Sequence, residues 1–267
     1  MKILITGSKG FVGTHLTRRL KEKHEVVSYD LKEGRDIFNQ KLLDKYFKGV
    51  DVVIHLAAFV SGIESWDKPE AYLLNNGIGT LKVIKSAIAD GVRKIIIFSS
   101  AAVYGDPLTP YGASKILAET IAKSYKDQIE VIIVRPFNIY GNGQNLAYGY
   151  VIHNFADGIK NKGQIEIYGT GNQTRDFIFI DDVINVVEKM IKGKSPSKPV
   201  DLGTGRDIKI TNLAKIIAKI LNKDYQINYL KPRKELLKSV ADTRVLKSLG
   251  IDSSNFIDLE KGLRKIL

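Results

Sequence analysis

The fold of this chain is decided by residues 2–30, which read KILITGSKGFVGTHLTRRLKEKHEVVSYD. The stretch opens with a short apolar strand, Lys2 to Thr6, and continues directly into a loop with glycines at positions 7, 10 and 13. The amphipathic run from Phe11 to Leu20 predicts a helix, and Glu25 to Tyr29 predicts a second strand. Strand, glycine loop, helix and strand in this order are typical of a parallel α/β fold.

The glycine loop also predicts a ligand. Glycines permit a tight turn and let a pyrophosphate approach the backbone N–H groups at the start of a helix. Asp30, at the end of the second strand, can accept hydrogen bonds from the adenosine ribose and would repel a 2′-phosphate. We therefore expect a dinucleotide site that selects NAD over NADP and contains Gly7, Gly10, Gly13 and Asp30.

A second informative stretch is FSSAAVYGDPLTPYGASK, residues 98–115. A buried-looking strand ends there in two serines, and after a loop a helix begins near Tyr111. Tyr111 and Lys115 are four residues apart and share one helix face, where an ammonium would lower the pKa of the tyrosine and make it a usable base and acid. Ser100 could reach the same substrate oxygen. Taken alone, the tyrosine and lysine would more often be ordinary surface residues.

Composition excludes several classes of function. The chain has 267 residues, 44% hydrophobic and 26% charged, as in a soluble globular protein, and no cysteine, so it has no disulfide or cysteine nucleophile. We expect a cytoplasmic protein, because the N-terminus enters a strand without a signal-peptide pattern and no apolar run approaches the ~20 residues of a membrane span. The four histidines lack ligand spacing, so we expect no metal site.

The net charge of +12 could indicate nucleic-acid binding. The lysines, however, are spread along amphipathic helices and are not clustered with aromatic residues. We interpret the charge as a lysine-rich solvated surface, with some attraction for anionic nucleotide sugars, and expect no nucleic-acid partner.

Taken together, the motifs identify a family. The chain resembles the extended short-chain dehydrogenase/reductases, specifically the nucleotide-sugar epimerases and dehydratases, and most closely the UDP-glucose 4-epimerases. The resemblance covers about residues 2–250. It is carried by Thr6-Gly7-x-x-Gly10-x-x-Gly13, Asp36-Ile37, His55-Leu56-Ala57-Ala58, Asn76-Gly77-Ile78-Gly79-Thr80, Ser100-Ala101-Ala102-Val103-Tyr104-Gly105, Tyr111-x-x-x-Lys115, Arg135-Pro136-Phe137-Asn138-Ile139-Tyr140-Gly141 and Gln173-Thr174-Arg175-Asp176-Phe177.

The resemblance and the alternation of strand-like and helix-like segments predict a Rossmann-like doubly wound parallel sheet for residues 1–143. Residues 144–267 would form mostly a smaller C-terminal α/β substrate lobe, with some segments returning to the main sheet. A long helix is expected from Pro69 to Asp90. Asn76, Gly77 and Gly79 are poor helix formers within it, which suggests a functional demand at that point.

The resemblance also implies the role of each site residue. Ser100, Tyr111 and Lys115 would be catalytic. The NAD-binding residues would be Gly7, Gly10, Phe11, Val12, Gly13, Asp30, Leu31, Asp36, Ile37, Leu56, Ala57, Ala58, Asn76, Ser99, Tyr111, Lys115 and Phe137. A nucleotide sugar, most readily a UDP-sugar, would contact Ser100, Tyr111, Asn138, Val151, Ile167, Tyr168, Arg175, Arg233 and Ser239. Helices 70–90 and 111–126 would form a homodimer surface.

The assignments of Arg233 and Ser239 leave alternatives open. The spacing around Arg233 differs from the family pattern, and a surface salt bridge is nearly as good an interpretation. Ser239 would border the pocket for the C2 substituent of the sugar, where a small residue could admit N-acetyl groups. It could equally be an ordinary strand residue.

The reaction follows from what surrounds the catalytic set. In this family the 4,6-dehydratases follow the serine or threonine with Asp-Glu, and UDP-glucuronate decarboxylases carry a nearby glutamate. This chain has Ala101-Ala102, which can do no acid–base chemistry. The sequence thus favours reversible oxidation at C4, a UDP-glucose/UDP-galactose 4-epimerase. Another epimerase, a dehydratase or a reductase of the family, acting on UDP-GlcNAc or a dTDP-sugar, and a non-catalytic NAD sensor are the alternatives.

One departure from the family pattern concerns the segment between Gly105 and Tyr111, which is shorter than in typical members. Since that segment usually closes over the sugar, we expect a more open and less selective site.

Overall fold

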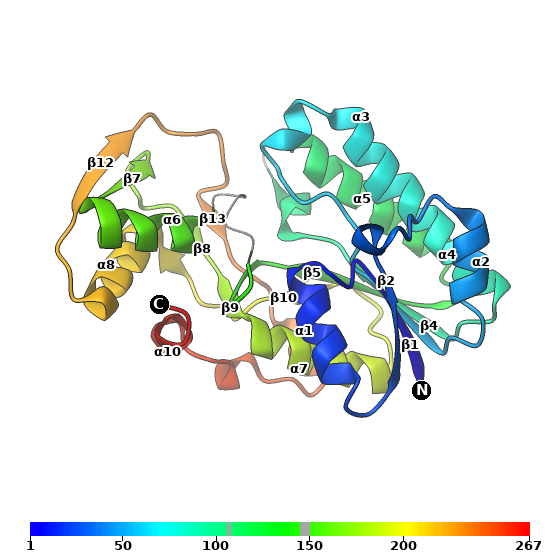
Figure 1. The fold of residues 1–267 in the computed structure, drawn as a ribbon. Coiled ribbons are helices and arrows are strands. Elements are labelled where there is room, and N and C mark those ends of the chain that lie inside the picture. The colour runs from blue at the N-terminus through cyan, green and yellow to red at the C-terminus, as the bar shows by residue number, and fades with distance from the viewer. Residues whose placement is uncertain (106–107, 145–149) are drawn as a thin grey trace. The chain divides into compact units, whose positions relative to one another are not determined.

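The computed structural model describes residues 1–105, 108–144 and 150–267, so part of the short segment before Tyr111 lies outside the described residues (Figure 1). The chain divides into two compact units, one of residues 1–136 and 184–201 and one of residues 137–183 and 202–267. The first unit was expected to end at residue 143. Residues 137–143 belong instead to the second unit, because β6 (Asn138–Tyr140) pairs with β9 (Phe177–Phe179) there.

The first unit is built on a six-stranded sheet with the order β10-β5-β4-β3-β1-β2. β1 pairs in parallel with β2 and with β3, and β4 pairs in parallel with β3 and with β5. This parallel pairing confirms the predicted doubly wound fold. Its elements are β1 (Lys2–Thr6), α1 (Phe11–Leu20), β2 (Glu25–Tyr29), α2 (Gln40–Tyr46), β3 (Val52–His55), α3 (Pro69–Tyr72), α4 (Gly79–Ala89), β4 (Lys94–Phe98), α5 (Pro110–Ser124), β5 (Glu130–Pro136), most of α7 (Ile180–Lys192) and β10 (Val200–Leu202).

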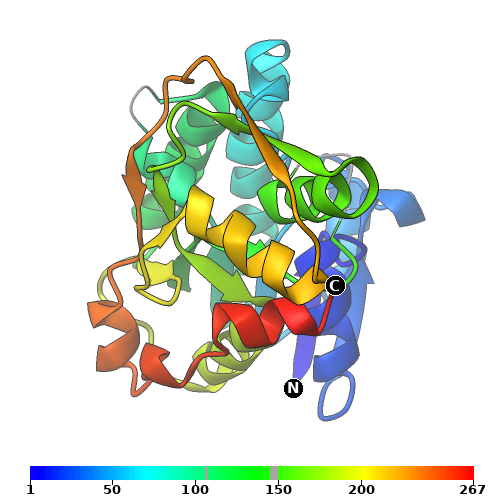
Figure 2. The ribbon, with the colours of Figure 1, turned by 90° about the vertical axis from the view of Figure 1, so that its left-hand side faces the viewer.

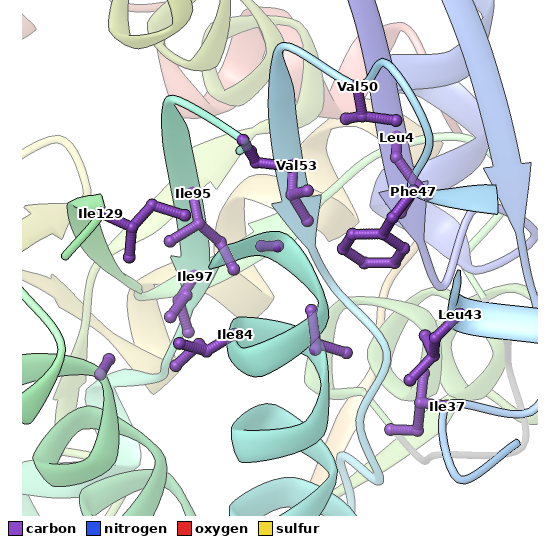
Figure 3. Close-up of a cluster of buried hydrophobic side chains, with 14 of the residues drawn as sticks. Leu4, Ile37, Leu43, Phe47, Val50, Val53, Ile84, Ile95, Ile97 and Ile129 are labelled. Atoms are coloured by element: carbon purple, nitrogen blue, oxygen red, sulfur yellow. The ribbon is translucent and has the colours of Figure 1, made fainter. Parts of the chain in front are cut away.

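Both faces of this sheet are covered, which explains why its strands are almost continuously apolar. On one face, side chains of β1, β3 and β4 pack with α2 and α4 in a buried cluster that includes Phe47, Ile84 and Ile95 (Figure 3). On the other face lie α1 and α7, which are joined by an ion pair between Arg19 and Glu188 at 3.1 Å.

Lys94 is a buried exception to this apolar pattern. Its side chain lies among the strands with no exposed area, and its Nζ donates to the carbonyl oxygens of Met190 at 3.1 Å and Gly193 at 2.5 Å. The ammonium thus satisfies carbonyl groups that the end of α7 leaves without helical partners. It fixes that end of α7 against the sheet.

The strand order reverses between β1 and β3, because the chain builds β2 on one side of β1 and then crosses to the other side. Ligands of such sheets bind in the crevice outside the carboxyl ends of the strands at this point. The glycine loop follows β1 and residues 56–58 follow β3, so the fold brings both predicted segments to the same edge.

The helix expected from Pro69 to Asp90 is interrupted. α3 is followed by a π-helical segment, Leu73–Ile78, and only then by α4. The weak helix formers Asn76 and Gly77 lie inside the π-helical segment. π-helical insertions are frequent at functional sites. This one lies where the sequence analysis found poor helix formers and expected a functional demand.

The second unit contains small sheets and helices. Its elements are β6, α6 (Val151–Asp157) continued by a π-helical turn (Gly158–Lys162), β7 (Gln164–Tyr168), β8 (Thr174–Arg175), β9, β11 (Ile208–Lys209), α8 (Ile210–Leu221), β12 (Gln226–Leu230), β13 (Lys238–Ser239), α9 (Arg244–Ser248) and α10 (Leu259–Arg264). β7 pairs with β12, and β8 lies between β11 and β13. The yellow α8 and the red α10 run side by side in Figure 2. Lys219 of α8 forms an ion pair with Glu260 of α10 at 3.2 Å.

Candidate active site

The glycine loop after β1 is packed so closely that side chains are excluded. A Cβ on Gly7, whose φ is +70°, would lie 2.7 Å from the backbone nitrogen of Ala57, and a Cβ on Gly13 would lie 2.2 Å from the carbonyl oxygen of Gly7. Gly10 stands at the N-cap of α1, where it has no side chain to cover the amides of Phe11 and Val12. These features fit the pyrophosphate of a dinucleotide, which binds to the exposed amides of a helix start.

Asp30 lies at the end of β2, 8% exposed, beside the glycine loop. Its Oδ2 accepts a hydrogen bond from the backbone N–H of Lys9 at 2.8 Å, and its Oδ1 accepts one from the backbone N–H of Lys32 at 2.9 Å. A carboxylate has about four acceptor positions, so ribose hydroxyls could still be accepted. The neighbouring Leu31 is exposed.

Asp36 and Ile37, expected beside the adenine, differ in burial. Asp36 is exposed and its Oδ1 accepts from the N–H of Phe38 at 2.9 Å, whereas Ile37 is buried against Gly79 at the start of α4.

A buried hydrogen-bond chain behind the loop was not predicted from the sequence. Thr6 Oγ1 accepts from the backbone N–H groups of Leu56 and Ala57, each at 3.2 Å. It is also 2.7 Å from Nδ1 of His55, whose Nε2 is 3.0 Å from Thr80 Oγ1. Thr80 in turn donates to the carbonyl oxygen of Asn76 at 2.6 Å.

This series of hydrogen bonds fixes the tautomer of His55. Since Thr6 Oγ1 already accepts two N–H groups, its own proton goes to Nδ1, which leaves the histidine proton on Nε2 facing Thr80. Burial, with a smaller effect of the charge of Lys115, lowers the pKa of His55 to about 3. The imidazole is therefore neutral and ties the ends of β1 and β3 to the π-helical segment.

Asn76, predicted near the cofactor, is 1% exposed and bonded on every polar position. Its Oδ1 accepts from Phe59 N at 2.8 Å and from Asn75 Nδ2 at 3.0 Å, and its Nδ2 donates to Phe59 O at 3.0 Å and Ser114 Oγ at 2.9 Å. Ser114 Oγ then donates to the carbonyl oxygen of Tyr111 at 2.7 Å. Asn76 thus ties the segment after β3, where Ala58 lies, to the first turn of α5.

The predicted catalytic residues gather around the end of β4. Lys115 is 6% exposed and its Nζ donates to the carbonyl oxygen of Phe98 at 2.9 Å. The same Nζ lies 5.9 Å from the ring centre of Tyr111. Burial lowers the pKa of Lys115 to about 8, against the opposing effect of Glu119.

Ser100 lies at the start of the turn Ala101–Tyr104, and its Oγ accepts from the N–H of Ala102 at 3.1 Å. α5 approaches this turn closely, since a Cβ on Gly112 would lie 2.6 Å from the carbonyl oxygen of Ala102. Ser100, Tyr111 and Lys115 therefore come from one compact region, which fits proton transfer at a hydroxyl or carbonyl oxygen.

A second unpredicted group, the buried ion pair of Glu119 and Arg135, packs next to this region. Glu119 is 3% exposed and accepts from Arg135 Nη2 at 2.6 Å and Nε at 2.7 Å, and from Ser99 Oγ at 2.7 Å. Arg135 also donates to the hydroxyl of Tyr104 at 2.6 Å. Burial would raise the pKa of Glu119, but the hydrogen bonds of Arg135 and Ser99 outweigh it and the pKa is lowered. The ion pair joins α5 to β5, and its hydrogen bonds to Ser99 and Tyr104 connect it to the turn Ala101–Tyr104.

In the second unit, Asp176 organises the predicted substrate residues. It has no exposed area, and its carboxylate accepts from Thr204 N at 2.9 Å, Thr204 Oγ1 at 2.6 Å, Gly205 N at 2.8 Å and Ala241 N at 3.2 Å. Its carbonyl oxygen accepts from the side-chain amide of Asn138 at 2.8 Å. The segment that begins at Phe137 is thereby fixed beside Arg175.

Arg175 and Arg233 are both held in defined positions. Arg175 donates to the carbonyl oxygen of Leu236 at 3.0 Å and pairs with Glu235. The guanidinium of Arg233 lies 3.4 Å from the ring centre of Tyr168, so this arginine stacks on an aromatic ring.

The other predicted substrate residues also belong to the second unit. Ser239 pairs with Arg175 across β13 and β8, Val151 begins α6, and Ile167 is buried in β7 beside Gly171. The structure thus brings Ser100, Tyr111 and Lys115 together in one unit, and Asn138, Arg175 and Ser239 together in the other.

The described ranges hold neither a cluster of metal-ligand residues nor a membrane-spanning helix. Over residues 1–105, 108–144 and 150–267, no group of three or more His, Cys, Asp or Glu side chains could hold a metal ion. In the same ranges no helix has the length and apolar character needed to cross a bilayer.

Comparison with known proteins gives consistent matches along the chain. The model of the NAD dependent epimerase/dehydratase family matches residues 3–203. A putative UDP-glucose 4-epimerase of Methanocaldococcus jannaschii is 31% identical over 300 residues, covering 99% of this chain and 97% of that protein. UDP-glucuronic acid decarboxylase 1 of Xenopus tropicalis is 29% identical over 302 residues, covering 100% of this chain and 71% of that protein.

A similar solved structure is a UDP-N-acetylglucosamine 4-epimerase from Methanobrevibacter ruminantium M1 in complex with UDP-N-acetylmuramic acid. It is 27% identical, with a TM-score of 0.91, and the match covers 99% of this chain and 96% of that one.

Proposed function

The chain belongs to the NAD dependent epimerase/dehydratase family, and we propose that within it this enzyme is a nucleotide-sugar 4-epimerase that interconverts UDP-glucose and UDP-galactose. The cofactor is NAD. The observation that carries the proposal is the pair Ala101-Ala102 directly after Ser100, beside an intact Tyr111 and Lys115. In the family that this chain resembles, dehydratases follow this serine or threonine with Asp-Glu, and decarboxylases carry a nearby glutamate.

Among the described residues, the carboxylates that hydrogen bonds connect to this turn do not supply that group. Glu119 is bound to Arg135 and Ser99, and Asp201 accepts from the hydroxyl of Tyr104 at 2.8 Å. Both oxygens of Glu119 accept hydrogen bonds from the Arg135 guanidinium, which disfavours protonation of the carboxylate. This pairing supports oxidation at C4 without elimination or loss of carbon dioxide.

The roles of the catalytic residues follow from their chemistry. When bound, NAD supplies the hydride acceptor and returns the hydride. Tyr111 takes the proton of the 4-hydroxyl and later gives it back, while the nearby ammonium of Lys115 favours the phenolate. Ser100 donates a hydrogen bond to the same sugar oxygen. Rotation of the 4-keto sugar between the two hydride transfers inverts C4.

The second unit holds the other predicted substrate residues. Arg175 and Arg233 suit the diphosphate, since a guanidinium recognises phosphate oxygens in pairs. Asn138 would hydrogen-bond the substrate, and Val151, Ile167, Tyr168 and Ser239 would line the nucleotide and sugar. The small Ser239 would also admit an N-acetyl group at C2.

The same proposal includes a cytoplasmic homodimer. Leu73, Leu74 and Ile78 of the helical stretch 70–90 and Ile116 of α5 are large exposed hydrophobic side chains. Their burial against a second copy would remove apolar surface from water.

Turnover of UDP-glucose by the purified protein and its Tyr111→Phe variant tests the proposal. Loss of the acid/base group should slow formation of UDP-galactose by roughly 10²-fold or more. Tyr125→Phe is the matched control, because it removes a hydroxyl about 20 Å further along the same helix and should turn over like wild type. Near-normal turnover by Tyr111→Phe would contradict the assignment.

A further inference from the structure

A compact group of charges surrounds Lys9 in the glycine loop. We call Lys9, Ser28, Asp30, Glu33 and Arg35 the Lys9 cluster. The backbone N–H of Lys9 donates to Asp30 Oδ2 at 2.8 Å, and its Nζ lies 3.0 Å from Glu33 Oε1. The other oxygen of Glu33, Oε2, lies 3.0 Å from Arg35 Nη1. One carboxylate therefore pairs with two cations next to Asp30.

The backbone holds this arrangement in place. Asp30 caps a single helical turn, Leu31–Glu33, and Gly34 follows with a φ of +71°. That left-handed conformation reverses the chain, so Arg35 returns beside Glu33. The guanidinium of Arg35 lies 4.5 Å from the ring centre of Tyr46, which limits its movement.

Glu33 is also fixed on its own account. Ser28 Oγ donates to Glu33 Oε2 at 2.8 Å, and Ser28 Oγ is 2.6 Å from Ser8 Oγ in the glycine loop. The hydrogen bond of Lys9, followed by those of Ser28 and the charge of Arg35, lowers the pKa of Glu33 against the effect of burial. The carboxylate is thus ionised at neutral pH.

The position of the cluster gives it a function. The carboxylate at the end of the second strand of this fold faces the adenosine 2′-hydroxyl, and a nearby arginine is the usual means of accepting a 2′-phosphate. The backbone N–H of Lys9 donates to the Asp30 carboxylate, and Arg35 follows the turn that Asp30 caps, so both cations belong to the segments that flank this carboxylate. Without Glu33, these cations would attract the two extra charges of NADP and offset the repulsion by Asp30.

We propose that Glu33 is a second specificity residue of the cofactor site, which occupies Lys9 and Arg35 and thereby prevents them from binding a 2′-phosphate. Asp30 repels the phosphate, while Glu33 removes the cations that could compensate. Selectivity for NAD then depends on two carboxylates in one turn. This inference concerns the cofactor alone and is independent of which sugar is the substrate.

Equilibrium titration of the nucleotide-free protein with NAD and with NADP tests this proposal. Glu33→Gln removes the carboxylate from both cations at nearly constant volume, while Arg35 keeps its hydrogen bond to the Ser28 carbonyl oxygen. In this variant the affinity for NADP should rise at least tenfold while that for NAD changes less than threefold. The gain should shrink in high salt, because the cluster is partly exposed and its charges are screened. Glu22→Gln, at an exposed glutamate in the turn after α1, changes the net charge equally and should leave both affinities unchanged.

Adding Lys9→Met to Glu33→Gln should remove most of the gain in NADP affinity. An unchanged ratio of the two affinities in Glu33→Gln would overturn the proposal. Equal weakening of both cofactors, or loss of the folded circular-dichroism spectrum, would assign Glu33 a structural role and overturn it as well.

Discussion

Acidification from pH 7.5 to 5.0 should destabilise this protein through His55. Burial holds the pKa of His55 at about 3 in the folded chain, against its ordinary value of 6.5 once unfolded. Below pH 6.5 the unfolded chain therefore binds a proton that the folded chain does not, so stability is lost as the pH falls. At pH 5.0 the loss amounts to about 2 kcal/mol, from 1.36 kcal/mol for each of roughly 1.5 pH units.

The perturbation that isolates this effect is His55→Gln. The glutamine amide can still donate toward Thr80 but offers less to Thr6, so we expect it to cost about 1–3 kcal/mol at pH 7.5. The variant has no imidazole at this position, and its stability should fall about 2 kcal/mol less than that of wild type between the two pH values.

Urea unfolding at both pH values, followed by circular dichroism, measures the difference. His15→Gln, the same substitution on α1, serves as the control and should keep the wild-type pH dependence. If wild type and His55→Gln lose the same stability on acidification, the buried neutral histidine does not exist as described.

Three further predictions use the same physical reasoning. Burial lowers the pKa of Lys115 to about 8 from its ordinary 10.5, so the unfolded chain keeps a proton that the folded chain loses. Thermal or urea unfolding should therefore show wild type gaining about 2 kcal/mol over Lys115→Met between pH 7.5 and 9.5, and equal slopes would contradict this. Asp176→Asn turns an amide toward backbone N–H groups and should cost about 2–5 kcal/mol in urea unfolding, whereas the exposed Asp224→Asn should cost almost nothing. Ser239→Tyr should abolish conversion of UDP-N-acetylglucosamine and spare UDP-glucose, and a wild type inert toward the acetylated sugar would refute this role.

The parts of the site that could be predicted from sequence lie within short stretches. The loop from Gly7 to Gly13 and the helical pair Tyr111 and Lys115 need only local geometry, because glycine spacing and a four-residue repeat fix their arrangement. The fold of the first unit followed from the same local patterns. The interruption at Asn76 was visible as poor helix formers, although nothing in the sequence specified a π-helical segment.

The parts that could not be predicted depend on residues far apart in the chain. Arg135 and Asp176 belong to recognised motifs, but nothing in the sequence marks Glu119 and Thr204 as their partners until the fold buries them together. His55 was noticed as part of a motif, but its partners Thr6 and Thr80 lie on other elements. The end of the first unit was expected at residue 143 and lies at residue 136 for the same reason. β6 pairs with β9, which follows it by some forty residues.

Conversion of UDP-glucose that carries deuterium at C4 tests the central claim most directly. The purified protein, supplied with unlabelled NAD in ordinary water, should form UDP-galactose of unchanged mass with the deuterium still at C4, because the hydride leaves and returns to the same carbon. A product lighter by water or loss of the C4 label to solvent would contradict a 4-epimerase, as would release of carbon dioxide in a parallel assay with UDP-glucuronate as the substrate.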